Sequence, residues 1–242
     1  MTRRGLAAIS AGILAWWGTA GPAQAQEWKF TLIPRGSYTT TSKLYFNPDA
    51  QSPDIRSQHA ELTGVFGGGL EVRVQNRENA FFLALAIEYL TTTDRRSQLV
   101  AFTDPPRTLP VEEGYSLLPI ELSGNMYIPL GTNTVRVGMG GGVGAYFGHR
   151  ILSVAGVSAD AVNKRVGLGI HVRTTVEYQV RSGVYLMGEM RFRDPEVETF
   201  NRFGQESVFH NGTEVRFPAD DIKARVNVHG MSFGLGLLIE IL

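Results

Sequence analysis

The sequence predicts an all-β fold, an eight-stranded antiparallel up-and-down transmembrane β-barrel that follows a cleavable signal peptide. Three observations lead to this prediction. Apolar residues recur at every second position along eight segments, the connections between these segments alternate between short and long, and the chain begins with an apolar targeting segment. A period of two indicates strands, and tight turns at one end with long loops at the other are typical of outer-membrane barrels.

The N-terminus has the organisation of a secretory signal peptide. Arg3 and Arg4 supply positive charge, residues 6–17 form an apolar run, and Ala23-Gln24-Ala25 is a small-x-small cleavage site. The run is shorter than the ~20 apolar residues that a membrane-spanning helix needs. We therefore expect residues 1–25 to be a signal peptide and residues 26–242 to form one barrel domain.

Eight segments of alternating character are expected to form the barrel wall. Along the third, Phe81, Leu83 and Leu85 share one face, and along the sixth Leu168 and Ile170 do so. Charged residues are absent from these apolar faces. The predicted strands span residues 28–41, 59–75, 80–93, 115–129, 134–150, 164–180, 184–193 and 222–242.

The fifth segment has an unusual second face. Val135 and Val137 begin its apolar face, whereas glycines at positions 138, 140, 142 and 144 alternate with that face. Glycine weakens a strand because it has no side chain to pack, so four on one face need a reason. We expect a curved wall in which these glycines leave room in the interior for long side chains from the facing wall.

The connections between the predicted strands alternate in length. Residues 76–79, 130–133 and 181–183 are short turns, which are expected at the periplasmic end together with both termini. The long connections are expected to be four exposed loops on the opposite side, formed by residues 42–58, 94–114, 151–163 and 194–221.

Aromatic residues on the apolar faces gather near the two ends of the strands. Such belts are expected where a barrel meets the two membrane interfaces. The belt near the short turns comprises Trp28, Phe81 and Tyr178, and the belt near the long loops comprises Tyr89, Phe147 and Phe192.

The faces opposite the apolar ones carry charges of both signs. The alternation alone fits a soluble sandwich as well as a membrane barrel, but the targeting segment, the even strand number and the loop pattern favour the membrane. An eight-stranded lumen can just be filled by side chains, and opposite charges can pair across it. We expect a structural charge network, not a catalytic site, formed by Glu71, Arg73, Glu88, Glu121, Arg136, Arg173, Glu177, Glu189 and Arg191.

Composition excludes several classes of function. Lys and Arg number 23, as do Asp and Glu, so the chain has no excess of positive charge for nucleic acid. The absence of cysteine excludes disulfides and thiolate metal sites. Neither a calcium loop nor a dinucleotide fingerprint is present, so we expect no metal and no cofactor.

Three segments resemble the small outer-membrane β-barrel superfamily of the OmpA, OmpX and OmpW type: residues 137–147, Pro119-Ile120-Glu121-Leu122 and Met126-Tyr127-Ile128-Pro129. Residues 236–242 resemble the C-terminal signal that the barrel-assembly machinery reads, with Leu242 in place of the usual Phe or Trp. The resemblance implies a multi-pass β-barrel in the outer membrane of a Gram-negative cell. It implies no particular function, because functions differ widely among proteins that share a fold.

Three functions remain open from the sequence. The first is a structural or surface-interaction protein with a largely plugged lumen, a monomer in contact with outer-membrane lipid and lipopolysaccharide. The second is a narrow pore or a carrier for small apolar molecules. The third is a lipid A-modifying enzyme, for which Ser123, Glu121 and His171 are the candidate inner-face residues.

Overall fold

The computed structural model describes residues 28–76, 79–100, 102–131 and 134–241. The predicted signal peptide and its cleavage site lie outside the described residues. Among the described residues, no helix has the length and apolar character needed to cross a membrane. The elements are β1 Trp28–Tyr45, α2 Pro53–Arg56, β2 His59–Asn76, β3 Phe81–Val100, β4 Arg107–Ile128, β5 Val135–Val154, β6 Val157–Lys164, β7 Gly167–Arg181, β8 Val184–Arg193, β9 Glu196–Phe203, β10 Ser207–His210, β11 Thr213–Arg216, β12 Ile222–Asn227 and β13 Met231–Ile241.

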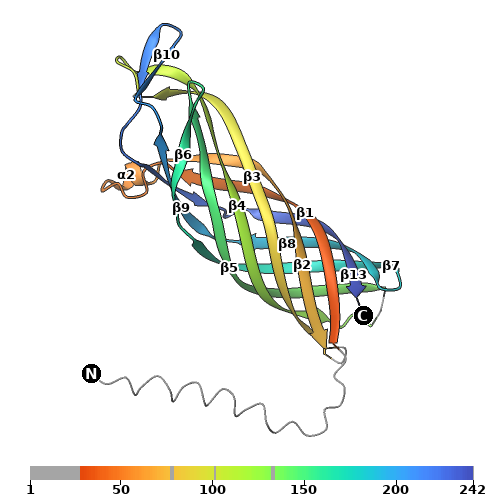
Figure 1. Cartoon of the computed structure of the whole chain (residues 1–242). Helices are drawn as coiled ribbons and strands as arrows, with labels where there is room; N and C mark the ends of the chain where they lie inside the picture. Colours follow the sequence, from red (N-terminus) through yellow and green to blue (C-terminus); the bar gives the residue numbers. More distant parts are fainter. Residues whose placement is uncertain (1–27, 77–78, 101, 132–133, 242) are drawn as a thin grey trace, which may run out of the picture.

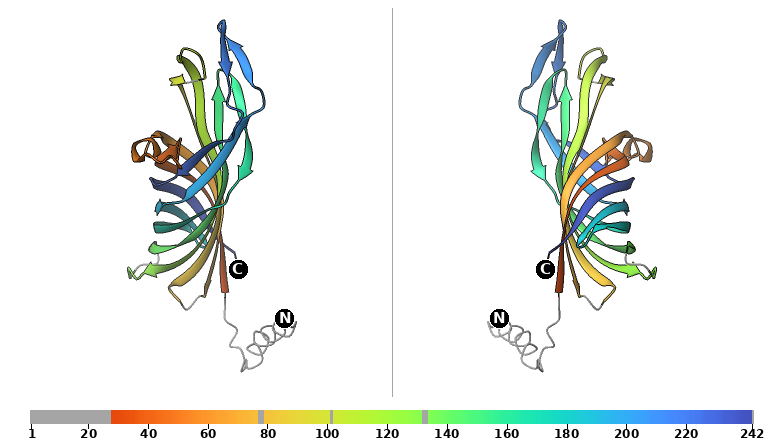
Figure 2. Two further views of the ribbon diagram at one scale, coloured as in Figure 1. Left: turned by 90° about the vertical axis from the view of Figure 1, so that its left-hand side faces the viewer. Right: turned by 90° about the vertical axis from the view of Figure 1, so that its right-hand side faces the viewer.

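The wall consists of long antiparallel strands that wrap around a common axis (Figures 1 and 2). β1 pairs with β2 along one edge and with β13 along the other, so the pairings run β1–β2–β3–β4–β5–β7–β8–β13 and return to β1. Phe30 faces Ile241, which places the described chain ends at the same end of the wall. The short connections lie at this end as well (Figure 1), which we call the short-turn end.

The strand count differs from the prediction. The described residues form thirteen strands, not eight, because three of the predicted loops contain β-structure and the predicted strand over residues 222–242 is two separate strands, β12 and β13. β3 and β4 stay paired as far as Val100 and Arg107, and β5 turns back into β6. β6 pairs with β9, β9 with β12, and β12 with the end of β1. Of the four predicted loops, only residues 46–58, which include α2, remain a true connection.

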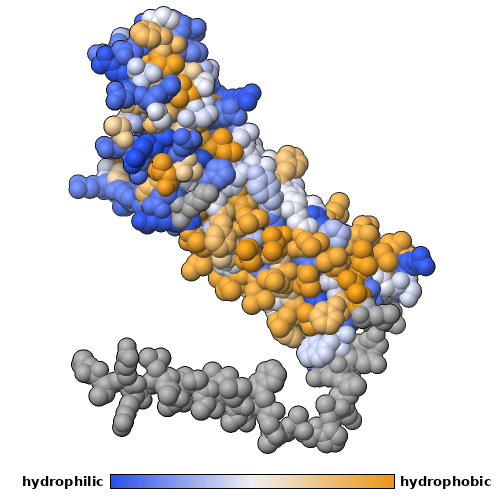
Figure 3. Space-filling view, viewed as in Figure 1, coloured by the Kyte–Doolittle hydropathy of each residue, from blue (hydrophilic) through white to orange (hydrophobic). Residues whose placement is uncertain are grey.

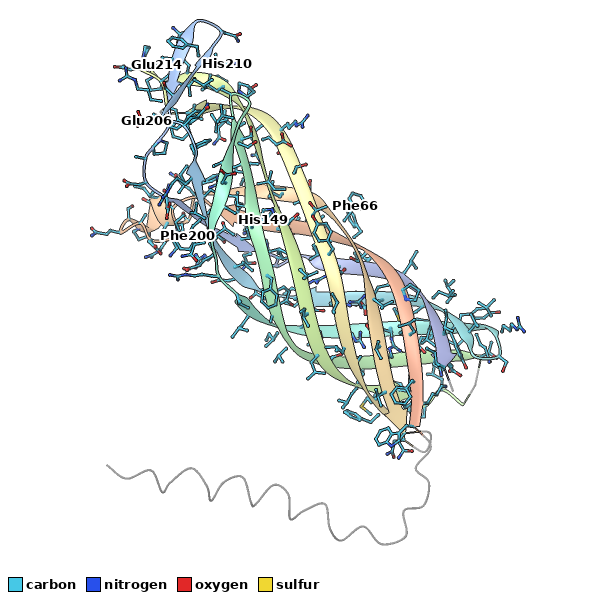
Figure 4. The ribbon with its side chains drawn as sticks, in the orientation of Figure 1. Phe66, His149, Phe200, Glu206, His210 and Glu214 are labelled. Carbon is cyan, nitrogen blue, oxygen red and sulfur yellow. The ribbon has the colours of Figure 1, made fainter. Side chains whose placement is uncertain are left out.

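These strands build a protrusion, here called the extension, from residues 93–114, 151–164 and 196–227 (Figure 1). Its apolar side chains explain why it folds, since alternate residues bury each other as in any sheet. Phe203 stacks on Phe217 with ring centroids 4.1 Å apart. Glu206, His210 and Glu214 lie near its far tip (Figure 4). The buried members of its core are Leu109, Val111, Leu152, Val154, Phe203, Val215 and Phe217.

The predicted apolar faces point outward. Leu85 is 47% exposed, Leu168 is 77% exposed and Val143 is 60% exposed. Figure 3 shows a continuous apolar zone over the wall, whereas the extension is mainly hydrophilic. A soluble protein would not leave so large an apolar surface in water. The wall is therefore built to contact a hydrocarbon medium.

Candidate functional site: the charged lumen

The structure places all nine predicted network residues on the inner side of the wall. β2, β3, β4, β5, β7 and β8 each contribute at least one of them. Eight are nearly inaccessible, with exposed fractions between 0 and 8%. Arg136 lies nearer the short-turn end, and its side chain is 19% exposed. Because these side chains come from most strands of the wall, their contacts join strands that are far apart in sequence.

Glu71 is the centre of one group of ion pairs. Its carboxylate accepts hydrogen bonds from Arg35 at 2.9 Å, from Arg73 at 2.7 Å and from Arg173 at 2.6 Å. Arg173 also donates from Nε to the side-chain oxygen of Asn125 at 2.8 Å. Residues from β1, β2, β4 and β7 thus meet on one carboxylate and its partners.

Arg191 and Arg193 are the centre of a second group. Arg191 donates to Glu121 at 2.6 Å and also pairs with Glu189. Arg193 donates to Glu88 at 3.0 Å, and Glu189 in turn accepts from Arg35 at 3.2 Å. The shared residue Arg35 connects this group with the one around Glu71, so the lumen charges form one network.

The network continues toward the short-turn end. Glu177 pairs with Arg73, lies 2.8 Å from Arg136 and accepts a hydrogen bond from the Tyr127 hydroxyl at 3.1 Å. The guanidinium of Arg136 lies 3.8 Å from the ring centroid of Tyr185, a cation–π contact. Aromatic rings therefore contact the charges in this part of the network.

Sequence reasoning missed two arginines of this network, Arg35 and Arg193. Arg193 stands two positions after Arg191 and shares its face, so the alternation already contained that signal. Arg35 lies on β1, where the apolar pattern is less regular and gave no clear face. Both are buried, with exposed fractions of 6% and 0%.

The network contains equal numbers of arginines and glutamates, and Lys29 pairs with Glu240 at its short-turn end. Six arginines (Arg35, Arg73, Arg136, Arg173, Arg191, Arg193) face six glutamates (Glu71, Glu88, Glu121, Glu177, Glu189, Glu240). Burying an ion costs several kcal/mol unless a partner and further hydrogen bonds compensate. Each carboxylate here has at least one arginine partner, so the folded barrel meets that condition.

Some arginine nitrogens nevertheless have no hydrogen-bond acceptor in the protein. Among the described residues, Nε of Arg35, Arg191 and Arg193 and Nη2 of Arg35 are buried without a hydrogen-bond acceptor. Buried polar atoms of this kind normally bind ordered water. The network therefore leaves several buried arginine N–H groups without an acceptor among the described residues.

An apolar layer lies between the charges and the extension. Tyr146 belongs to both, because its hydroxyl donates to Glu121 at 2.6 Å while its ring joins the apolar cluster. The layer draws on inner positions of β1–β5, β9 and β12, which converge where the wall continues into the extension. Its buried members are Leu44, Ala60, Leu62, Val65, Leu90, Tyr115, Leu117, Tyr146, Val197, Ala224, Val226 and Val228.

The inner glycines of β5 have two different tasks. At Gly144 a Cβ would lie 2.9 Å from the Glu121 side chain and 3.0 Å from Tyr146, so this glycine makes room for lumen side chains as predicted. At Gly142 the limiting atom is the backbone oxygen of Leu122, only 1.9 Å away. Here glycine permits close approach of β4, which follows from the tight curvature of the wall.

The candidate catalytic residues do not form a triad. Ser123 and His171 are both buried on the inner side, but the Ser123 hydroxyl accepts a hydrogen bond from Asn125 at 3.0 Å. His171 Nδ1 has no partner among the described residues. A nucleophile needs a hydrogen-bonded base, and this pair does not provide one. Within the described ranges, no cluster of three or more potential metal ligands occurs either.

Comparison with known proteins supports the fold. No protein-family model and no curated protein matches the chain. A major outer membrane protein from Thermus thermophilus is similar with a TM-score of 0.53 and 10% identity, over 88% of this chain and 99% of that one.

Two further solved structures are more distant. Ail, the attachment invasion locus protein of Yersinia pestis, solved with the heparin analogue sucrose octasulfate, gives a TM-score of 0.44 with 11% identity over 88% of this chain and 99% of its own. Neisserial surface protein A gives 0.41 with 13% identity over 88% and 97%. Identities this low bear on the fold alone, for which the Thermus structure is the support. The chain has the fold of the outer-membrane β-barrel proteins.

Proposed function

We propose that this chain is an integral outer-membrane protein whose β1, β2, β3, β4, β5, β7, β8 and β13 form a closed eight-stranded barrel with a plugged lumen. Its role is structural or in surface interaction, and the extension is the part that stands outside the cell. The extension takes the place of three of the four exposed loops expected from the sequence. A rigid sheet suits a surface-interaction role, because ordering it on binding costs little conformational entropy.

The observation that carries this proposal is the filling of the lumen in two layers. The arginine–glutamate network fills the middle, and the apolar layer fills the end toward the extension. An ion that crosses would have to separate buried ion pairs and then enter an apolar layer, and both steps are costly.

A narrow pore is the second candidate. The unpartnered nitrogens of Arg35, Arg191 and Arg193 support it, because they mark positions where water would bind inside the barrel. The two candidates differ in whether the apolar layer opens. A lipid A-modifying enzyme has no comparable support, since Ser123 and His171 are not hydrogen-bonded to each other.

Single-channel recording in planar bilayers tests the plug. We expect the wild-type protein to be silent, and Arg173→Ala and Glu121→Ala to produce openings because each removes part of the network. Heat-dependent gel mobility establishes that each variant is folded. Stable conductance of the wild type would overturn the plugged lumen and favour the pore.

Trypsin added to intact cells tests the orientation. Arg56, in the connection between β1 and β2, and Arg181, the last residue of β7, are both exposed and lie at opposite ends of the barrel. With the extension outside, trypsin cuts at Arg56 in intact cells and at Arg181 only after the outer membrane is permeabilised. The reverse order would invert the orientation.

The partners proposed from the sequence fit this arrangement. Outer-membrane lipid and lipopolysaccharide would surround the apolar wall, and the barrel-assembly machinery would recognise β13, whose residues alternate between exposed and buried. We propose a monomer, because the ring of strand pairings leaves each of the eight wall strands paired on both sides within one chain.

A further inference from the structure

The chain that returns from the tip of the extension is longer than the stretch of β5 that it faces. The pairing of β5 with β7 ends where Tyr146 faces Gly167, and the pairing of β5 with β6 is limited to the tip, where Ser153 faces Ser158. Between these two pairs β5 contributes six residues and the returning chain contributes eight, and strand pairing is interrupted. The returning chain therefore carries a surplus of two residues relative to β5.

The same surplus appears on the side of β9. Leu168 of β7 faces Glu196, and Ala159 of β6 faces Phe203, so eight residues on the β6 side lie opposite six residues of β9. A register shift at Val162 takes up part of this difference. Because both neighbours show the same difference, the two extra residues belong to β6 and to the segment that joins it to β7.

A competing register would remove this surplus. If the register of Leu168 and Glu196 continued along β6 and β9, Arg202 would face Val162, whereas in the structure Arg202 faces Asp160. β6 would then lie two residues closer to the tip of the extension, and the two extra residues would enlarge its turn with β5. The pairing between β5 and the returning chain would become continuous.

Apolar packing distinguishes these two registers only weakly. A shift by two residues leaves each side chain on its own face of the sheet, because the side-chain period of a strand is two. On the inner face the shift would bring Ala161 to the place that Ala159 occupies opposite Phe203. One alanine would replace another, so the apolar core of the extension provides little selection between the registers.

The side chain of Asn201, on β9, spans the interruption between β5 and β6. Asn201 is fully buried, and its Nδ2 donates to the backbone oxygen of Arg150 on β5 at 3.2 Å and to that of Ala159 on β6 at 3.4 Å. Backbone oxygens beside an interrupted ladder need other donors, and this amide reaches both strands. In the competing register the backbone of β6 would pair with β5 and take the place of the amide.

Burial of Asn201 has a cost that these two hydrogen bonds offset. Its Oδ1 is buried without a hydrogen-bond partner among the described residues, and an unpaired buried polar atom is unfavourable. An apolar side chain would avoid that cost but could not donate to β5 and β6. The two donated hydrogen bonds are therefore what asparagine contributes at this position.

We propose that Asn201 selects the register of β6 by stabilising the form with two extra residues. Its amide holds β5 and β6 apart, and without it the register of β7 and β9 continues into β6. Asn201 is thus a determinant of the shape of the extension. The inference goes beyond the proposed function, because it does not depend on the state of the lumen or on which end of the barrel faces outward.

Disulfide trapping in the full-length exported protein, reconstituted in lipid vesicles, tests this selection. The chain has no cysteine, so each introduced pair is the only one. The first pair, Asp160→Cys/Arg202→Cys, reports the observed register, and the second, Val162→Cys/Arg202→Cys, reports the competing one. All three positions are exposed. Directly facing residues of antiparallel strands have Cα separations that a disulfide can span.

Both cysteine pairs are placed in the wild type, in Asn201→Leu and in the matched control Thr199→Val. The control removes a buried side-chain hydrogen bond from the same strand, but one that is directed toward β12 and away from the interruption. We expect the wild type and Thr199→Val to cross-link mainly the first pair. In Asn201→Leu the ratio of first to second product should fall by about tenfold, which corresponds to about 1.4 kcal/mol of lost preference between the registers.

An unchanged ratio in Asn201→Leu, or an equal fall in Thr199→Val, would overturn the proposal. Trypsin digestion of the extension and heat-dependent gel mobility of the barrel are measured in parallel. If the extension of Asn201→Leu is digested and neither pair cross-links, Asn201 maintains the fold of the extension and not its register, which would overturn the proposal as well.

Discussion

Glycine has opposite consequences on the two sides of this wall. Inside, Gly142 lies so close to the backbone of β4 that no side chain fits without movement of a strand. Outside, Gly36 has room for a Cβ at ordinary contact distance. The same residue type is therefore required for curvature at one position and is replaceable as far as the barrel fold is concerned at the other.

A matched pair of alanine substitutions measures this difference. Gly142→Ala forces the backbone of β4 to shift, and we expect it to lower the free energy of unfolding by about 1–3 kcal/mol, as overpacking does. Gly36→Ala should change it by less than about 0.5 kcal/mol or stabilise slightly. Urea unfolding in lipid vesicles gives both values. Similar losses at both positions would contradict the geometry.

The most connected carboxylate of the lumen provides a second prediction at this scale. Glu71→Gln leaves Arg35, Arg73 and Arg173 without their shared anion. Loss of one partner from a buried ion pair costs about 3–5 kcal/mol, so we expect a loss of that order in the same unfolding assay. Glu112→Gln is the control, because its pair with Arg95 is exposed and is worth about 0–1 kcal/mol. A neutral Glu71→Gln would mean that the network does not stabilise the barrel.

The extension behaves as a folded element with its own core. β10 and β11 form a separate two-stranded sheet, and the chain beside them packs on β4, β5 and β9 through Phe203 and Phe217. We therefore expect that this core can be weakened without loss of the barrel.

Two phenylalanines of the extension test this independence. Phe217 is 7% exposed and Phe209 is 76% exposed. Phe217→Ala removes a buried ring, and we expect a loss of about 3–5 kcal/mol in local stability, seen as faster proteolysis of the extension with unchanged heat-dependent mobility of the barrel. Phe209→Ala should leave proteolysis unchanged. Loss of the mobility shift in Phe217→Ala would show that barrel and extension fold as one unit.

An exposed ion cluster joins the β1–β2 connection to the extension. Lys223 donates to Asp49 at 2.7 Å and lies 2.8 Å from Glu198. Hydrogen bonding with Lys223 lowers the pKa of Glu198, and hydrogen bonds with Asp49 and Glu198 raise the pKa of Lys223. The contribution of Glu198 is therefore present above its unfolded pKa of about 4.3 and is lost as the pH falls through the lower folded value.

The raised pKa of Lys223 has the opposite effect on how stability depends on pH. Its contribution is complete below the unfolded pKa of about 10.4 and is lost as the pH rises through the folded value. The cluster thus stabilises between about pH 5 and 10, by less than about 1 kcal/mol because it is exposed. Hydrogen exchange of residues 46–58, corrected for intrinsic rates, should show less protection at pH 3 than at pH 7. In Lys223→Met that difference should disappear; its persistence would exclude the cluster as the cause.

At the scale of the whole molecule, polarity is inverted relative to a soluble protein. Apolar side chains cover the outside of the wall and the extension has a mainly hydrophilic surface (Figure 3). Charges fill the inside of the wall, and the extension has an apolar core. The outer surface of the chain therefore changes from apolar to hydrophilic where the wall continues into the extension.

Arginine substitutions on the outer face test this inversion by depth. Leu85→Arg and Val172→Arg, near the middle of the apolar stretches of β3 and β7, should each cost about 2–4 kcal/mol of stability in lipid vesicles. Tyr178→Arg, close to the short-turn end, should cost about 0–1 kcal/mol. All three positions are about half exposed, at 47%, 58% and 54%. Equal losses at the three positions would speak against a membrane around the wall.

The sequence by itself determined which side chains share a face. The alternation at Phe81–Leu83–Leu85, or at Glu71 and Arg73, follows from the two-residue period of a strand and needs no knowledge of the neighbours. Signals of this kind were sufficient for the antiparallel all-β class, the outward apolar faces and nine members of the lumen network. They failed for Arg35, because the irregular pattern of β1 does not show which face is inner.

Only the tertiary structure decided which residues from distant parts of the chain contact each other. Residues 94–114 contain polar residues and prolines that suggest a loop. Residues 94–100 and 107–114 are nevertheless strands, and Leu109 and Val111 pack in one buried cluster with Phe203 and Phe217 from a distant part of the chain. The convergence of Arg35, Arg73 and Arg173 on Glu71 likewise depends on register and curvature across the whole wall. Periodicity is a local property of the chain, whereas these contacts are set by loop closure and strand pairing between segments that are distant in sequence.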